Sequence, residues 1–317
     1  MSKQLRHLKP GGKAAFVDRY TTRANSLLVN YEEGVKGEYG LVGLPLSKTS
    51  ISHSGASFAP GAIREALQSY TVYSGEERFD LRDQMIDFGD VYLSPTNLIQ
   101  NQDTLYEALV DVFRADAARN YFLLGGDHSV SYSAIKAYVE VFGEVGVIQF
   151  DAHHDLRNTE DGGPTNGTPF RRLLTDGILS GDNLVQIGIR DFTNARAYHE
   201  YAEEEGVSVY TMGDVLDSGI GSILKREINR LKEKVSTIYI SLDMDVLDQA
   251  YAPGCPAIGP GGMTSHTLFE GLALLSKEAS VKVMDIVEID PTIDIRNMTS
   301  RVAAYSLLQF MKGKAIK

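Results

Sequence analysis

Aspartates and histidines gather at the ends of three apolar runs in this sequence. The run YFLLGG leads into Asp127 and His128, GVIQF leads into DAHHD at 151–155, and TIYISL leads into DMD at 243–245. A charged group is costly to bury without a partner. Side chains that follow buried runs therefore need water or a cation, which makes these three motifs the first candidates for chemistry.

The spacing within two of the motifs places carboxylates and imidazoles on one side of the chain. Alternate side chains of an extended segment face the same way. The side chains of Asp151, His153 and Asp155 can then converge on one point, while His154 is directed elsewhere. The two aspartates of DMD at 243–245 repeat the arrangement.

With His128, these groups carry too much negative charge for one ion and suit two adjacent divalent cations. Oxygen-rich ligation with some imidazole favours manganese over zinc. Two ions ~3.5–4 Å apart can share a water and convert it to hydroxide at neutral pH, a nucleophile for a carbon centre. Each motif alone is also compatible with a turn or a helix cap, but the three together favour a metal site.

Short apolar, β-branched runs alternate with helical patterns along the chain, which predicts an α/β fold with a mainly parallel sheet and helices on both sides. The expected strands begin at Gly40, Met85, Tyr121, Gly146, Asn183, Val207, Thr237 and Val281. The expected helices begin at Pro60, Asp103, Ser129, Ser222 and Met298. Parallel sheets bind ligands at the carboxyl ends of their strands, where the acidic motifs lie. We expect one domain over residues 1–317, with 1–35 as an N-terminal extension.

Composition restricts the kinds of partner. The 317 residues include 31 basic and 42 acidic side chains, for a net charge of −11. This balance argues against nucleic acid and anionic membranes as partners and leaves a small-molecule substrate. A single cysteine, Cys255, excludes an intramolecular disulfide and favours a cytoplasmic protein. No run approaches the ~20 apolar residues of a membrane-spanning helix.

The motifs GGDHS at 125–129, DAHHD at 151–155 and SLDMDVLD at 241–248 resemble the three metal motifs of the ureohydrolases, the family of arginase, agmatinase and formimidoylglutamase. The resemblance extends from about Gly40 to Met311. It implies a three-layer α/β/α sandwich, an arginase-like fold, with two Mn²⁺ ions per subunit. It also implies hydrolysis of a linear amidine C–N bond and assembly into a homo-oligomer, a trimer or hexamer.

The family's ligands and catalytic acids are carried over onto the matching positions. The implied metal ligands are His128, Asp151, His153, Asp155, Asp243 and Asp245. Asp151 and Asp243 would bridge the ions. Asp155 resembles the aspartate that also bonds the bridging hydroxide, and Glu288 in VEIDP resembles the acid that pairs with the cationic end of the substrate. Glu288 by itself is also compatible with a solvated acid at a strand end.

Two departures from arginase concern the substrate. Arginases have a proton-shuttling histidine in a His-Gly loop, where this chain has Asn166-Gly167-Thr168. They have Asp-Ile-Asn where this chain has Asp155-Leu156-Arg157. Asp-Leu-Arg with Gly-Thr-Pro-Phe resembles the formimidoylglutamase branch. We therefore take Asn166 and Thr168, with Arg157, as candidate substrate contacts.

Charge supports this assignment, because four ligand aspartates and Glu288 would repel a substrate that carries two carboxylates unless a cation lies nearby. Arg157 can bind a carboxylate in bidentate fashion, and Arg190 is a second candidate. Ion pairs of Arg157 with Glu160 or Asp161, and of Arg190 with Asp191, are the alternatives.

The expected reaction is hydrolysis of N-formimidoyl-L-glutamate to L-glutamate and formamide in histidine degradation. The alternative is an agmatinase or another guanidino-ureohydrolase that releases urea.

Overall fold

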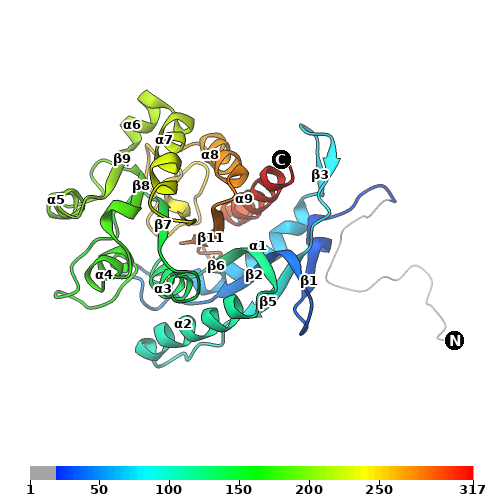
Figure 1. Cartoon of the computed structure of the whole chain (residues 1–317), viewed down its shortest axis with the longest axis horizontal. Coiled ribbons are helices and arrows are strands. Elements are labelled where there is room, and N and C mark those ends of the chain that lie inside the picture. The colour runs from blue at the N-terminus through cyan, green and yellow to red at the C-terminus, as the bar shows by residue number, and fades with distance from the viewer. Residues whose placement is uncertain (1–18, 317) are drawn as a thin grey trace.

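Nine strands form one parallel sheet in this computed structural model, which describes residues 19–316 (Figure 1). The order across the sheet is β1-β5-β2-β6-β11-β10-β7-β8-β9. These strands are β1 (Leu28–Asn30), β2 (Gly37–Leu44), β5 (Met85–Asp90), β6 (Ala118–Gly125), β7 (Val145–Phe150), β8 (Leu184–Ile189), β9 (Ser208–Thr211), β10 (Thr237–Asp243) and β11 (Val281–Val287). A separate hairpin pairs β3 (Tyr73–Ser74) with β4 (Phe79–Asp80).

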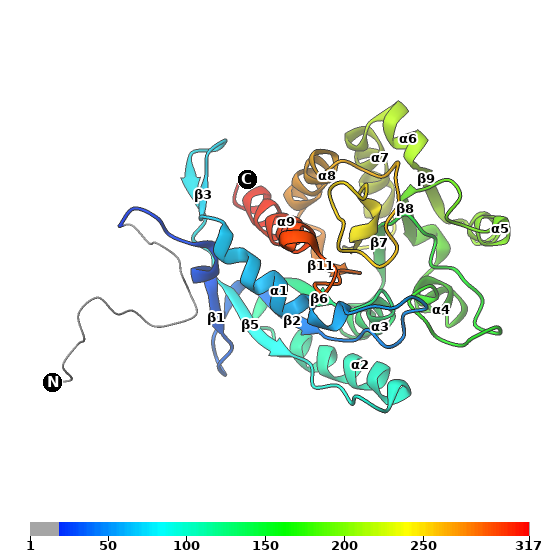
Figure 2. The ribbon, with the colours of Figure 1, turned by 180° about the vertical axis from the view of Figure 1, so that it is seen from behind.

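Helices cover both faces of the sheet and give three layers (Figures 1 and 2). One layer contains α1 (Ala59–Ala66), α6 (Met212–Ser218), α7 (Ile220–Lys232), α8 (Ser265–Lys277) and α9 (Met298–Ala315). The other contains α2 (Leu98–Arg114), α3 (Val130–Phe142), α4 (Pro169–Thr175) and α5 (Arg196–Glu204). The predicted α/β/α sandwich is confirmed. No helix within residues 19–316 is long and apolar enough to cross a membrane.

Each run predicted as a strand forms one, and the predicted helices correspond to α1, α2, α3, α7 and α9. Helices α4 and α6 were not predicted, because seven residues each are too few to show a helical period. Helices α5 and α8, strand β1 and the β3–β4 hairpin were not predicted either. Residues 1–18 of the predicted extension lie outside the described range, whereas Leu28–Asn30 pair with β5 as an edge strand.

Side chains alternate across the central strands and divide the core in two. On β10, Ile238 and Ile240 pack with the α7–α9 layer, whereas Tyr239 packs with the α3 layer. Because the period of a strand is two residues, Ser241 shares the face of Tyr239. The α3-facing side of the sheet also carries three buried polar residues of neighbouring strands: Gln149, Gln186 and Asp285.

Candidate metal centre and active site

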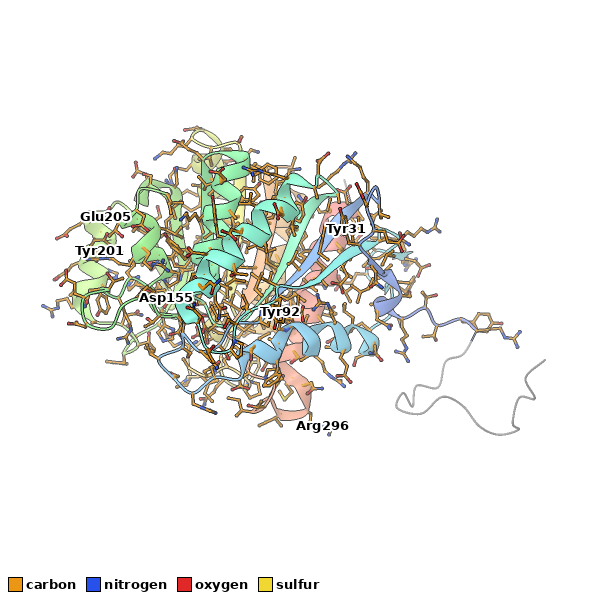
Figure 3. All side chains as sticks on the ribbon, turned by 90° about the horizontal axis from the view of Figure 1, so that it is seen from below. Tyr31, Tyr92, Asp155, Tyr201, Glu205 and Arg296 are labelled. Carbon is orange, nitrogen blue, oxygen red and sulfur yellow. The ribbon has the colours of Figure 1, made fainter. Side chains whose placement is uncertain are left out.

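Four adjacent strands deliver the acidic motifs to one edge of the sheet. The strands β6, β11, β10 and β7 are neighbours in that order. His128 follows β6, Glu288 follows β11, Asp243 ends β10 and Asp151 follows β7. The carboxyl ends of parallel strands share an edge, which is why residues far apart in the sequence meet here. Figure 3 shows Asp155 on the side of Tyr201 in α5, away from Tyr31 beside β1.

The first cluster surrounds the imidazole of His128. Its Nδ1 lies 2.8 Å from an oxygen of Asp155, 3.1 Å from Asp243 and 3.2 Å from Asp151. One ligand atom from each of these four residues lies within 4.8 Å of the others. The geometry brings together the four residues expected to hold the first ion.

The second cluster contains Asp151, His153 and Asp245, again with ligand atoms within 4.8 Å of one another. His153 Nδ1 lies 3.0 Å from Asp245 Oδ2 and 3.4 Å from Asp151 Oδ1. Asp151 therefore faces both clusters, one oxygen toward each imidazole. Asp243 belongs only to the first cluster, and its Oδ1 accepts a hydrogen bond from the amide of Asp245.

The prediction that Asp151, His153 and Asp155 converge on one point is wrong in its geometry. The 151–155 segment contains no strand, and Asp155 has a φ of 52°. This left-handed turn directs Asp155 toward His128, while His153 joins the other cluster. His154 is directed elsewhere as expected, with Nδ1 2.6 Å from Gln186 Oε1 and Nε2 3.2 Å from His199 Nδ1.

Gly126 sets the position of the His128 loop through a close backbone approach. Its amide donates to the Leu44 carbonyl, and the next amide, of Asp127, donates to the Leu46 carbonyl. A Cβ at Gly126 would lie 2.1 Å from the Leu46 carbonyl oxygen. Only glycine permits this contact, which holds the start of α3 against the end of β2.

The residues present fit a divalent metal centre. His128 Nδ1 is buried, has no hydrogen-bond partner in the part of the chain that the structure describes, and faces three carboxylates. Burial lowers the pKa of His153, but the charges of Asp245 and Asp151 outweigh burial and raise that pKa to about 12. Burial and the neighbouring aspartates raise the pKa of Asp243 well above its usual value. A site that draws protons onto its imidazoles and carboxylates in this way is one that a cation stabilises.

The two predicted catalytic acids have unusual backbone conformations and raised pKa values. Asp155 and Glu288 adopt left-handed conformations, with φ of 52° and 60°. Such strain clusters at active sites. Burial and the Asp151 charge raise the pKa of Asp155 to about 6, against the opposing charge of His128. Burial and the Asp127 charge raise the pKa of Glu288 to about 8, against a hydrogen bond from Asn166.

A cavity of about 310 Å³ opens over the two clusters, a volume that suits a small molecule. His153, Asp155, Asp243, Asp245 and Glu288 line its interior. Tyr198 of α5 also lines it, and the remaining lining residues come from loops: Ile51, Ser52, Leu156, Arg157, Asn166, Gly167, Thr193, Asn194, Ala195 and Ala257. Sequence reasoning missed the 193–198 segment, although it follows β8 at the same sheet edge.

Arg157 lies in the wall of this cavity with its guanidinium unpaired among residues 19–316. Its backbone amide donates to the Gly167 carbonyl, and its side chain crosses Gly167, whose Cβ position would lie 2.7 Å from Arg157 Cδ. The alternative ion pairs with Glu160 or Asp161 are absent from the described residues, and Asp161 bonds Asn158 instead. Arg157 is the one Arg or Lys among the lining residues that the structure describes.

Asn166 and Thr168 have different positions relative to the cavity. Asn166 lines it and donates from Nδ2 to Glu288 Oε1 at 3.0 Å, while its Oδ1 accepts the Ile51 amide. Thr168 is buried, and its hydroxyl donates to the Thr165 carbonyl 2.9 Å away. The prediction of Thr168 as a direct substrate contact is therefore wrong, because its hydroxyl is used in a hydrogen bond within the 165–168 turn.

Arg190 does not line the cavity above the clusters. It is buried, and its Nη2 donates to the carbonyls of Asp245 and Leu247. It lines a second cavity, formed with residues 191–193, 211–213 and 258–261. The prediction of Arg190 as a clamp for the substrate carboxylate is corrected by this placement. The guanidinium instead holds the backbone that follows the DMD motif.

The chain is similar to known proteins over nearly its whole length. The model of the "Arginase family" matches residues 38–312. A formimidoylglutamase of Halalkalibacterium halodurans is 52% identical over 96% of both chains. The crystal structure of Bacillus subtilis formimidoylglutamase has a TM-score of 0.94 at 43% identity and covers 98% of this chain and 97% of that chain. A variant of Trypanosoma cruzi formiminoglutamase, described with Mn²⁺, has a TM-score of 0.85 at 26% identity, covering 94% and 99% of the two chains.

Proposed function

The chain belongs to the arginase family, and on that basis we propose that it hydrolyses N-formimidoyl-L-glutamate to L-glutamate and formamide, a step of histidine degradation. One observation carries the choice of substrate: Arg157, whose guanidinium has no partner within residues 19–316, lies in the wall of the cavity whose interior is formed by the two acidic clusters. A cation in the wall and carboxylates in the interior of the cavity match a substrate with an anionic tail and a cationic amidine end.

We propose two Mn²⁺ ions, the first held by His128, Asp155 and Asp243 and the second by His153 and Asp245, with Asp151 between them. The donor clusters and the buried, unpartnered Nδ1 of His128 support this assignment. Divalent ions at such a site lower the pKa of bound water and supply a nucleophile at neutral pH. The resemblance implied that Asp243 would be shared by both ions, whereas its carboxylate lies in the first cluster alone.

Glu288 orients the cationic end of the substrate. Its Oε1 accepts hydrogen bonds from the His128 amide and from Asn166, whereas its Oε2 has no hydrogen bond within the described residues. Oε2 can therefore accept from the protonated amidine nitrogen. A cation beside the carboxylate lowers its pKa, so substrate binding favours the ionised form of Glu288. Arg157 binds a carboxylate at the other end of the substrate.

The chemistry forms one bond and breaks one. A water oxygen bonds to the formimidoyl carbon, and the bond from that carbon to the glutamate nitrogen breaks. The remaining nitrogen stays on the carbon as the amide of formamide, and the glutamate nitrogen leaves with a proton. Asp155, a carboxylate of the first cluster that also lines the cavity, would transfer that proton.

The rival reaction is urea release from a guanidino substrate such as agmatine. Agmatine ends in a cationic amine, and like charges repel, so Arg157 in the cavity wall opposes its binding. The Glu288 side of the cavity suits either substrate. Arg157 is therefore the residue that favours the formimidoyl substrate.

A substrate panel tests the proposal. Purified, Mn²⁺-loaded protein is assayed for formamide from N-formimidoyl-L-glutamate and for urea from agmatine and L-arginine. We expect formamide release, with urea release at least 100-fold slower. Rapid urea release without formamide would overturn the assignment.

We propose further that the enzyme works in the cytoplasm as a homo-oligomer. The single, buried cysteine supports a reducing compartment. The trimeric or hexameric state stays a prediction from the family resemblance.

A further inference from the structure

Asp285 is a buried carboxylate in the middle of β11, outside both acidic clusters. It is the cross-strand partner of Ser241 on β10. The hydroxyls of Ser131 and Tyr239 donate to its Oδ2 at 2.7 and 2.8 Å. The hydroxyl of Ser241 and the amide of Leu242 donate to its Oδ1 at 2.9 and 3.2 Å. Burial raises the pKa of Asp285, and the His128 charge and the three hydroxyls oppose that rise.

Ser241 connects this carboxylate to the first acidic cluster. Its hydroxyl oxygen lies 2.9 Å from Nε2 of His128. A serine hydroxyl has one proton to donate, and Ser241 donates it to Asp285. The Ser241 oxygen can then only accept, so Nε2 of His128 must carry a hydrogen.

This order of hydrogen bonds decides which ring nitrogen can bind a metal. With the hydrogen on Nε2, the Nδ1 atom of neutral His128 has a free lone pair, and this is the atom that faces Asp151, Asp155 and Asp243. The reverse order would place a hydrogen on Nδ1, directed into the space where the cation belongs. The tautomer of a ligand histidine is set by what its other nitrogen bonds.

We propose that Asp285 is a positioning residue that acts through Ser241 to hold His128 as the Nε2–H tautomer, with Nδ1 prepared to bind the first of the two ions. This inference rests on the proposed metal centre. It goes beyond it by assigning a function to a carboxylate that neither the clusters nor the reaction uses. The signal in the sequence is an aspartate inside an apolar strand run, VKVMDIV.

The effect should be confined to one ion. Ser241 bonds His128 of the first cluster, whereas His153 and Asp245 of the second cluster have no hydrogen bond with Ser241 or Asp285 among the described residues. A general loss of structure would lower the affinity for both ions. If only the tautomer of His128 is no longer held, the affinity for the first ion alone should fall.

The experiment titrates the full-length protein, stripped of metal, with Mn²⁺. The electron paramagnetic resonance signal of free Mn²⁺ reports the binding steps. For Ser241→Ala we expect one of two steps to weaken about 10- to 100-fold, the usual effect of losing a partner of a ligand histidine. For Asp285→Asn we expect a smaller loss in the same step, since the Leu242 amide keeps the side-chain oxygen in place but the charge is gone.

Ser131→Ala is the matched control, because it removes a hydroxyl from the other oxygen of the same carboxylate without touching His128. We expect wild-type Mn²⁺ affinities for it, and thermal unfolding monitors folding of all three variants. If Asp285→Asn does not fold, Ser241→Ala still provides the measurement.

The inference would be overturned if Ser241→Ala bound Mn²⁺ in two steps with wild-type affinities, or if both steps weakened equally. An equal loss of Mn²⁺ affinity in Ser131→Ala would also overturn it. Absence of Mn²⁺ binding by the wild type would instead overturn the metal centre itself.

Discussion

The substitution Arg157→Ala tests the origin of substrate choice most directly. Arg157 has no protein partner for its guanidinium among the described residues, so its removal leaves no other buried group unpaired. A hydrogen bond to a charged group contributes roughly 1.5–3 kcal/mol. Because Arg157 is exposed, we use the lower end, about 1.5 kcal/mol, which corresponds to about a tenfold change.

We expect the KM for N-formimidoyl-L-glutamate to rise about tenfold or more in Arg157→Ala, with a smaller change in kcat. The contact is made at the tail of the substrate in both the ground state and the transition state, and the loss of such uniform binding appears in KM. Arg157→Lys keeps a charge but cannot form the bidentate pair, so its KM should lie between those of the wild type and the alanine variant.

A substrate without carboxylates serves as the control. N-methylformamidine has the same reacting carbon and no anionic tail, so wild type and Arg157→Ala should hydrolyse it with equal kcat/KM. An unchanged KM for the glutamate substrate would refute the reasoning. An equal loss on both substrates would do so too, because Arg157 would then act on the shape of the cavity and not on the substrate tail.

Three further outcomes follow from the geometry. Asp151→Asn should lose both Mn²⁺ ions and at least 100-fold of the activity, since Asp151 faces both clusters; metal analysis of the purified variant with two ions still bound would contradict this. Adding Mn²⁺ at about 100 times its Kd should stabilise the wild-type fold by about 2.7 kcal/mol, seen as a higher Tm that EDTA reverses, whereas a Tm unaffected by Mn²⁺ would argue against a metal site. In a denaturant titration, Gly126→Ala should destabilise the fold by about 3 kcal/mol, because its Cβ would contact the Leu46 carbonyl. Gly61→Ala should be neutral or stabilising in that titration, because a Cβ there would meet no described atom within 4 Å beyond its chain neighbours and its own helix backbone.

The sequence by itself determined the architecture and the ligand types. Short apolar runs such as TIYISL are typical of strands that are buried on both faces. The parallel sheet was therefore predictable from the local sequence pattern. Charged residues directly after such runs must lie at the carboxyl edge, and the resemblance to the ureohydrolases implied which six of them are the candidate ligands. Short elements such as α4, with seven residues, contain too little periodicity to be predicted.

Only the tertiary structure decided how those residues are grouped and which arginine lines the cavity above them. The left-handed turn at Asp155 separates it from His153, and no alternation rule contains that turn. Arg157 and Arg190 are equivalent in the sequence as cations after strands, yet Arg157 lines the cavity and Arg190 bonds backbone carbonyls. The connection of Asp285 to His128 through Ser241 depends on the register of β10 against β11. Register is a property of the assembled sheet, set by contacts between strands that no single strand specifies.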